Sequence, residues 1–183
     1  SEMCIRDRCR VGGVNMIRKI KNDSGYSLVE LIIVLAIIAV MSGLAAVSIS
    51  SIRTARATSS KESFNQELST LQSLTKTQES DWAMKLEKVD GKYNLVYGKS
   101  KNGSDFTEDT SKDREILDRV TIYYSNNGSS AGSEVSSMII KFNKSDGSVK
   151  TGSGVYTFYK DGSNDAVGKV TLNQATGSHY TGS

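Results

Sequence analysis

One carboxylate stands at the start of a long apolar run, where an isolated charge needs a chemical reason. Glu30 precedes Leu31–Val47, a run of 17 residues in which only Ser42 and Gly43 are not apolar. A charged side chain at the middle of a bilayer costs about 2.5–3.5 kcal/mol, and the cost is smaller near the interface, where Glu30 lies. Such a carboxylate either reaches water at the membrane surface or pairs with a cation in an apolar setting.

A short basic segment lies upstream of this carboxylate. Residues 16–25 carry three basic side chains and one acidic side chain, Asp23. Basic residues beside an apolar run hold their end in the cytoplasm and direct the remainder outward. Arg53 and Arg56 lie beyond the run. They weaken the charge asymmetry, so the expected orientation rests on the basic leader.

The residues from Gly25 to Ile38 read GYSLVELIIVLAII. A basic leader, a glycine, an aromatic residue, a glutamate five positions after the glycine and an apolar helix together resemble the class III signal of type IV pilins and type II secretion pseudopilins. The resemblance covers Lys19 to about Ala46. It implies that a membrane prepilin peptidase cleaves between Gly25 and Tyr26 and that the new amine of Tyr26 is N-methylated. It also implies that the apolar helix stays in the mature protein.

The signal also suggests how subunits find their register. In a filament, subunits shift axially, so the Glu30 carboxylate of one subunit could meet the Tyr26 ammonium of another. In an apolar core the two charges would neutralise each other, whereas either one alone would be costly. Gly25 has no side chain to obstruct a narrow peptidase site. The residues expected to form the membrane helix are Leu31, Ile32, Ile33, Val34, Leu35, Ile37, Ile38 and Val40.

Two features depart from the family pattern, and one alternative stays open. Major pilins usually begin with Phe, where this chain has Tyr26, and many have a proline within the helix, whereas this chain has no proline. Ser42 and Gly43 could instead give the helix a weak point. A secretory signal would be cleaved at small residues after the apolar run, as at Ala45-Ala46-Val47, but that reading leaves Glu30 unexplained.

The first fifteen residues do not fit the rest of the chain. Residues 1–15 show neither apolar periodicity nor a leader pattern, and Met16 opens a self-consistent signal. We interpret them as a non-native extension, with a native cytoplasmic extension as the alternative. Both cysteines, Cys4 and Cys9, lie there. The mature chain is therefore expected to rely on packing and hydrogen bonds, without disulfides.

One helix is expected from about Ser27 to Gln78, which would be roughly 75–80 Å long. Its second half carries an apolar stripe of Phe64, Leu68 and Leu71, the spacing of a face that packs against a sheet. We expect a membrane or filament-core helix over residues 26–52, an amphipathic continuation over 53–88 and a β-rich extracytoplasmic head over 89–183. The expected fold class is α+β and pilin-like, with the helix packed on a small antiparallel sheet.

Beyond Lys88 the sequence changes to short runs rich in Val, Ile, Tyr, Phe and Thr, separated by Asp-Gly and Asn-Gly turns. Residues Glu108–Leu117 are expected to form a short helix. The head also has a weaker resemblance to H-type minor pseudopilins and minor fimbrial pilins, through a Phe-containing strand and two glycine turns; any antiparallel meander is the alternative. The expected strands are Lys92–Tyr97, Arg119–Ser125, Ser136–Asn143, Gly154–Lys160 and Gly168–Asn173.

No catalytic set is visible, so an enzyme is not expected, and no cofactor is expected either. His179 is the sole histidine and is expected near a flexible end, which disfavours a metal site. Residues 53–183 carry 17 basic and 16 acidic side chains. This balance disfavours nucleic acid as a partner, although folding could still assemble a small basic face.

The sequence therefore predicts a filament subunit, in the role of a minor pilin or pseudopilin. Its expected partners are a prepilin peptidase, other pilin or pseudopilin subunits, the inner or cytoplasmic membrane, an assembly platform protein and an ATPase. We expect a single-pass membrane protein that passes into an extracellular or cell-envelope filament. The alternative is a membrane-anchored binding protein that never polymerises and has no dependence on Glu30. The sequence does not separate pilus, secretion and DNA-uptake systems, which share this signal.

Overall fold

The computed structural model describes residues 26–128 and 132–182, and residues 44–50 by their backbone alone. The predicted extension (1–15), leader (16–25) and Gly25 lie outside these residues. The chain divides into two units between Ser42 and Gly43. Helix α1 runs Leu28–Thr77, in agreement with the helix expected from about Ser27 to Gln78. No proline interrupts it, so no backbone donor is lost along its length.

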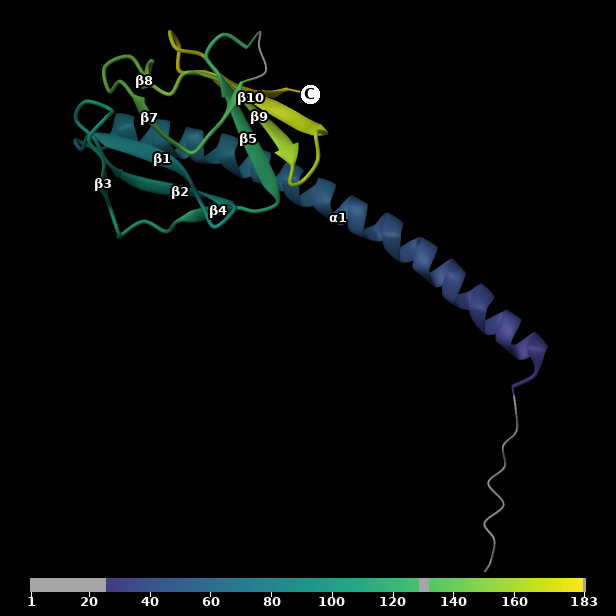
Figure 1. The fold of residues 1–183 in the computed structure, drawn as a ribbon. Helices are drawn as coiled ribbons and strands as arrows, with labels where there is room; N and C mark the ends of the chain where they lie inside the picture. Colours follow the sequence, from purple (N-terminus) through teal and green to yellow (C-terminus); the bar gives the residue numbers. More distant parts are fainter. Residues whose placement is uncertain (1–25, 129–131, 183) are drawn as a thin grey trace, which may run out of the picture. The chain divides into compact units, whose positions relative to one another are not determined.

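The second unit, the head, contains two antiparallel sheets and is of the expected α+β class. One sheet has the order β3-β2-β1-β7-β8, with β4 also paired to β2, and the other has the order β11-β10-β9-β5-β6 (Figure 1). The strands are β1 (Trp82–Val89), β2 (Lys92–Lys99), β3 (Thr107–Glu108), β4 (Glu115–Leu117), β5 (Val120–Ser125), β6 (Ser133–Glu134), β7 (Ser137–Phe142), β8 (Val149–Thr151), β9 (Gly154–Lys160), β10 (Ala166–Leu172) and β11 (His179–Gly182).

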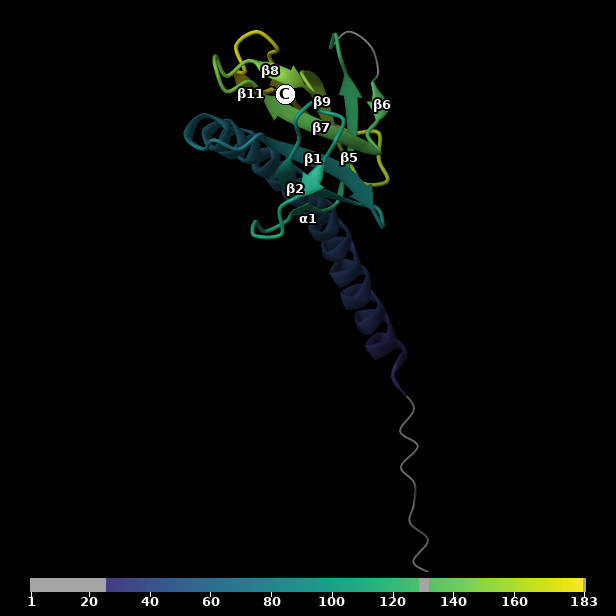
Figure 2. The ribbon, with the colours of Figure 1, turned by 90° about the vertical axis from the view of Figure 1, so that its left-hand side faces the viewer.

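Helix α1 supplies the centre of the head core. Its predicted stripe is fully buried: Phe64, Leu68 and Leu71 are each 0% exposed. The Phe64 ring lies 5.0 Å from the ring of Tyr156 and 5.5 Å from the ring of Phe158, both on β9. One hydrophobic cluster contains these helix residues together with residues of both sheets, and Figure 2 shows the strands gathered along this part of α1. The helix is thus the element that both sheets share.

Five predicted strands are confirmed as β2, β5, β7, β9 and β10, with bounds shifted by two residues or fewer. In β9 the predicted alternation is seen directly, since Tyr156 and Phe158 point into the core and their neighbours are half-exposed. The predicted Asp90-Gly91 turn joins β1 to β2, and both residues have positive φ, 51° and 77°. Positive φ at both central positions is the geometry of a two-residue hairpin turn whose twist matches that of the strands.

The boundary between helix and β-rich head was wrong. The amphipathic continuation was expected over residues 53–88, but α1 ends at Thr77 and β1 already begins at Trp82. The β1 sequence WAMKLEKV is rich in helix-forming residues. Its pairing with β2 on one side and β7 on the other outweighs a helix propensity of a few tenths of a kcal/mol per residue, roughly.

Two further expectations were wrong in the same direction. The short helix expected over Glu108–Leu117 is absent from this described segment, which instead forms β3 and β4, both paired with β2. The C-terminal tail is not free: β11 pairs with β10. His179 lies on β11, and its Nδ1 atom is 2.8 Å from Oδ1 of Asn65 on α1. Burial lowers the pKa of His179, which favours its neutral form.

Two similar turns of the head both accept a hydrogen bond from one side chain of α1, Gln72. The β7–β8 and β10–β11 turns each have a glycine amide donating to an asparagine carbonyl at 2.9 Å: Gly147 to Asn143, and Gly177 to Asn173. The amide nitrogen of Gln72 on α1 lies 3.4 Å from the Gly147 carbonyl and 3.3 Å from the Gly177 carbonyl. A side chain on Gly177 would meet the Gly147 carbonyl at 1.9 Å, so only glycine lets the turns approach this closely.

The core position of α1 gives a direct test of stability. Phe64→Ala should lower the free energy of unfolding by about 3–5 kcal/mol, because it removes a fully buried ring and leaves a cavity. The measurement is urea denaturation followed by fluorescence of Trp82, the single tryptophan. Glu62→Ala, whose side chain is 54% exposed, is the matched control and should change the value by less than about 0.5 kcal/mol. Equal effects of the two changes would contradict the assigned core.

Candidate functional site

The described part of the predicted signal begins at Tyr26. Tyr26 is 80% exposed and precedes the first helical residue, Leu28. Glu30 lies in the first turn of α1 and is exposed. Gly25 lies outside the described residues, so the structure does not bear on the predicted cleavage site. The roles of Gly25, Tyr26 and Glu30 therefore stay predictions.

The start of α1 places Ser27 and Glu30 at a spacing that the sequence analysis missed. The Leu31 amide donates to the Ser27 carbonyl at 3.1 Å, which makes Ser27 the N-cap residue of the helix. Ser27 and Glu30 then stand in the S-x-x-E spacing of a capping box, in which each side chain can accept a hydrogen bond from the other residue's backbone amide. A carboxylate in the first turn also interacts favourably with the helix dipole, by about 0.3–1 kcal/mol. The S-x-x-E spacing of Ser27 and Glu30 is visible in the sequence alone.

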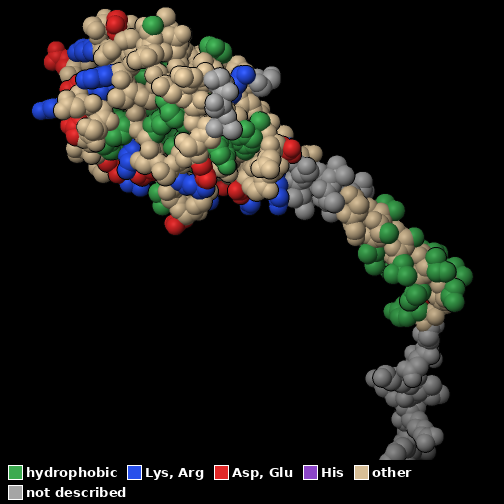
Figure 3. Space-filling model, turned by 45° about the horizontal axis from the view of Figure 1, so that its top comes forward, with side chains coloured by type: hydrophobic (Ala, Val, Ile, Leu, Met, Phe, Trp, Pro, Cys, Tyr) green, Lys and Arg blue, Asp and Glu red, His purple; other side chains and the backbone are tan. Residues whose placement is uncertain are grey.

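The apolar side chains after Glu30 are exposed within their unit. Figure 3 shows them as a hydrophobic surface on the described N-terminal part of α1. Exposed apolar surfaces of this kind mark sites that protein or lipid covers. No helix in the described residues is long and apolar enough to cross a membrane. The exposed fractions of the predicted membrane-helix residues are Leu31 55%, Ile32 56%, Ile33 53%, Val34 48%, Leu35 58%, Ile37 53%, Ile38 54% and Val40 64%.

Ser42 is a polar residue within this apolar surface, and its hydroxyl is hydrogen-bonded within the helix. The Ser42 hydroxyl donates to the Ile38 carbonyl at 2.7 Å, so no unpaired polar group is presented at that position. A side chain on Gly43 would meet nothing within 4 Å. Gly43 is therefore not required by packing within the described chain, and its effect is confined to a lower helix propensity.

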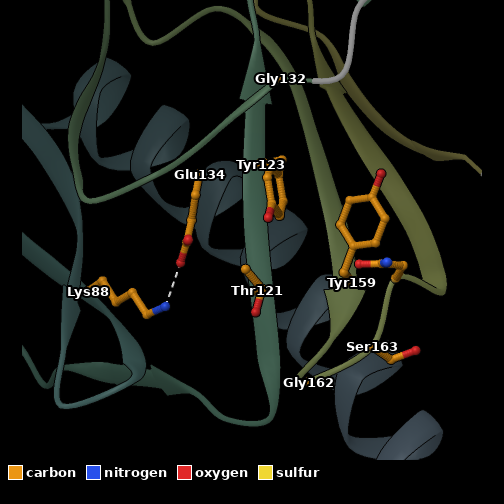
Figure 4. Close-up of a pocket in the computed structure, with 9 residues that line it drawn as sticks. Lys88, Thr121, Tyr123, Gly132, Glu134, Tyr159, Gly162 and Ser163 are labelled. Atoms are coloured by element: carbon orange, nitrogen blue, oxygen red, sulfur yellow. Dashed lines mark hydrogen bonds and ion pairs between the residues drawn. The ribbon is translucent and has the colours of Figure 1, made fainter.

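A hollow of about 520 Å³ lies beside β5 and β9 of the head (Figure 4). Tyr123 and Tyr159 meet edge to face there, with ring centres 5.2 Å apart. Of the nine lining residues only Lys88 and Glu134 are charged, and their side chains pair at 2.5 Å. The hydrogen bond from Lys88 lowers the pKa of Glu134. A neutralised pair and hydroxyl groups can hold water or a polar ligand, but they form no catalytic arrangement in this hollow.

The next feature is the placement of potential metal ligands in the part of the chain that the structure describes. No group of three His, Cys, Asp or Glu side chains is placed there to hold an ion. A lysine ammonium occupies one cluster of oxygens: Nζ of Lys141 lies 2.8 Å from the Asp81 carboxylate and also donates to the Ser100 carbonyl. This ammonium joins β7 to the segment before β1 and to the end of β2.

Comparison with known families places the signal independently of the geometry. A sequence profile of the prokaryotic N-terminal methylation motif matches residues 20–46. No curated protein and no solved structure matches the chain. The matched residues include Gly25, Tyr26, Glu30 and the exposed apolar face of α1. The match covers the segment that carries the resemblance to type IV pilins and pseudopilins, and it supports a prepilin-type signal at these residues.

Proposed function

We propose that the chain is a structural subunit, a minor pilin or pseudopilin, of a type IV pilus-like, type II secretion or DNA-uptake filament. The methylation motif at residues 20–46 carries this proposal. In the proposed sequence of events, a prepilin peptidase cuts after Gly25 and the new amine of Tyr26 is N-methylated. An assembly platform protein and an ATPase then bring the subunit together with other pilin or pseudopilin subunits.

The exposed apolar face of α1 supports two successive environments. In the first, residues 26–52 lie in the inner or cytoplasmic membrane, with the leader (16–25) on the cytoplasmic side and the head outside. In the second, the same apolar side chains pack against those of neighbouring subunits in a filament core. Both environments cover side chains that are half-exposed in the single chain, and burial of apolar area is the favourable term in each.

The head suits a structural role because α1 is also its core. Phe64, Leu68 and Leu71 bind both sheets to the helix, so the element proposed to assemble the filament also holds the head together. We infer from this arrangement a pilin-like fold. The H-type resemblance is part of the proposal as well, and the glycine turns at Gly147 and Gly177, joined through Gln72, are the features in its favour.

A membrane-anchored binding protein that never polymerises is the second candidate. The observation that favours it is the hollow lined by Tyr123 and Tyr159, which a polar ligand could enter. Such a protein needs an apolar anchor but has no use for a charge pair between subunits. The two candidates are therefore separated by whether the negative charge of Glu30 matters for assembly.

Processing is tested by expressing the chain with a prepilin peptidase and measuring the mass of the product. We expect a chain that begins at Tyr26 and carries one added methyl group. Gly25→Val should leave the precursor uncut, because a branched side chain obstructs a narrow peptidase site, whereas the neighbouring Ser24→Val should still be cut. A product cleaved near Ala46 would show that the segment is an ordinary secretory signal instead.

The register role of Glu30 is tested by two substitutions that separate charge from helix capping. Glutamine can still take part in a capping box, but it carries no charge. In a host with the assembly machinery, both Glu30→Gln and Glu30→Ala should lower filament incorporation by at least tenfold, since breaking a buried ion pair costs about 3–5 kcal/mol. Incorporation is measured by immunoblot of sheared or purified filaments.

The two variants also identify the other roles of this residue. If Glu30→Gln assembles normally and Glu30→Ala does not, the carboxylate acts through helix capping, and the charge-pairing role is wrong. If both variants assemble normally, neither role holds. Total membrane-bound protein in each strain is the control, because a loss there would report insertion or stability in place of assembly.

A further inference from the structure

Three arginines line two hollows at the start of the head, and we call Arg53, Arg56 and Arg119 the arginine cluster. One hollow of about 230 Å³ is lined by the cluster and Ile52. The other, of about 200 Å³, is lined by Arg53, Arg119, Asp161 and Gly162, so one carboxylate also lines it. Arg53 and Arg119 belong to both hollows, so the two form one basic depression on the head.

The backbone holds Arg119 in place at some cost. Arg119 has a φ of 61°, a left-handed conformation that costs a residue with a side chain about 1–2 kcal/mol. Its neighbour is fastened to α1, because the Ser60 hydroxyl donates to the Asp118 carbonyl at 3.0 Å. The Asp161 amide donates to the Arg119 carbonyl at 3.2 Å. Strained conformations fixed by their surroundings are a reason to look for a function.

Positive charge is in excess at this depression, because its lining holds three arginines and a single carboxylate, Asp161. The Asp118 carboxylate lies 3.3 Å from Arg56, 3.8 Å from Lys92 and 3.9 Å from Arg119, so three cations share it. Arg53 forms no ion pair with any residue that the structure describes. The side chains of Arg56 and Arg119 are 57% and 50% exposed. The guanidinium groups can therefore reach an anion from outside, which would offset their mutual repulsion.

We propose that the arginine cluster binds the phosphate headgroup of an anionic phospholipid in the outer leaflet while the subunit is still in the membrane, which rests on the function proposed above. Guanidinium groups match phosphate oxygens in a bidentate geometry. Ile52, 51% exposed, adds an apolar edge to the same hollow for the glycerol or acyl region. The ligand chemistry is thus a phosphate ester with an attached apolar body.

The place of the cluster in the chain favours lipid over other sources of phosphate. The membrane segment proposed above, residues 26–52, ends directly before Arg53. Arg53 and Arg56 follow at once, at the level of the headgroups. Nucleic-acid binding commonly engages about 6–10 phosphates, and a depression with three arginines offers too few contacts for that.

The test is a count of the lipids that stay bound to the membrane-resident chain. The chain is reconstituted in vesicles of equal parts phosphatidylglycerol and phosphatidylcholine, extracted in mild detergent and analysed by native mass spectrometry. Wild type should retain phosphatidylglycerol in preference to phosphatidylcholine. Arg53→Gln and Arg119→Gln should each lower that preference about fivefold, since a basic side chain at an anionic surface contributes about 1 kcal/mol.

Two further variants separate binding from folding. Arg114→Gln is the matched control, because Arg114 is also an arginine, is 54% exposed and pairs with Glu108, but lines neither hollow; it should retain the preference. Arg119→Gly should lose the preference while raising the urea midpoint of the head, because glycine adopts positive φ without strain. If the arginine variants lose phosphatidylglycerol only under conditions in which their heads are unfolded, the loss reports folding, and the proposal is overturned.

The remaining outcomes decide the source of the anion. If inorganic phosphate in the buffer abolishes the preference at concentrations that leave phosphatidylglycerol in excess, the depression is a free-anion site and the lipid assignment is wrong. Equal retention of the two lipids by a chain that resists carbonate extraction would overturn this inference and leave the proposed function standing. A chain that is neither cut by the peptidase nor retained in the membrane would instead contradict the proposed function.

Discussion

The burial of one helical stripe between two sheets is the contact on which the rest of the head depends. Phe64, Leu68 and Leu71 are each fully buried, and no single sheet encloses them. One sheet reaches the helix through Tyr97, whose hydroxyl donates to the Glu67 carbonyl at 3.2 Å. The other reaches it through Tyr156, whose ring lies 5.0 Å from that of Phe64. Removing α1 would leave two sheets with facing apolar surfaces and nothing between them. The helix is therefore part of the head's fold and cannot be only an anchor attached to it.

The elements that the sequence predicted are those whose local pattern and tertiary context agree. The β9 run alternates in sequence and in burial, and the Asp90-Gly91 turn has the positive φ values that its residue types favour. The elements that were missed depend on distant partners. WAMKLEKV in β1 has the composition of a helix and becomes a strand because β2 and β7 hydrogen-bond to both its edges. Pairing of this kind is a non-local contact that a window of sequence does not contain.

The candidate site differs from the missed strands, because most of it could be predicted from the sequence. Little of it depends on tertiary structure. The glycine, aromatic residue and glutamate spacing lies within one short segment, and the profile match covers the same residues. What the structure adds is the start of α1 at Leu28, which places Ser27 and Glu30 at the two positions of a capping box. The charge that is proposed to set register between subunits would thus also fix where the helix begins. A single substitution at Glu30 changes both properties, and only the comparison of glutamine with alanine separates them.

The basic residues beyond the apolar run lack a counter-charge on their own helix, and the arginine cluster suggests what neutralises them. Arg53 and Arg56 lie on the side of the apolar segment that should carry fewer positive charges, and α1 alone offers them no counter-charge. Folding of the head brings Asp118 to Arg56 and, in the same loop, adds a third arginine at a strained φ. A head that needed only neutralisation would gain more from a second carboxylate at position 119 than from another cation. The observed arrangement instead concentrates positive charge around a depression with an apolar edge at Ile52. Such a surface is stabilised by an anion that carries its own apolar part, which is the chemistry of an acidic phospholipid at the membrane surface.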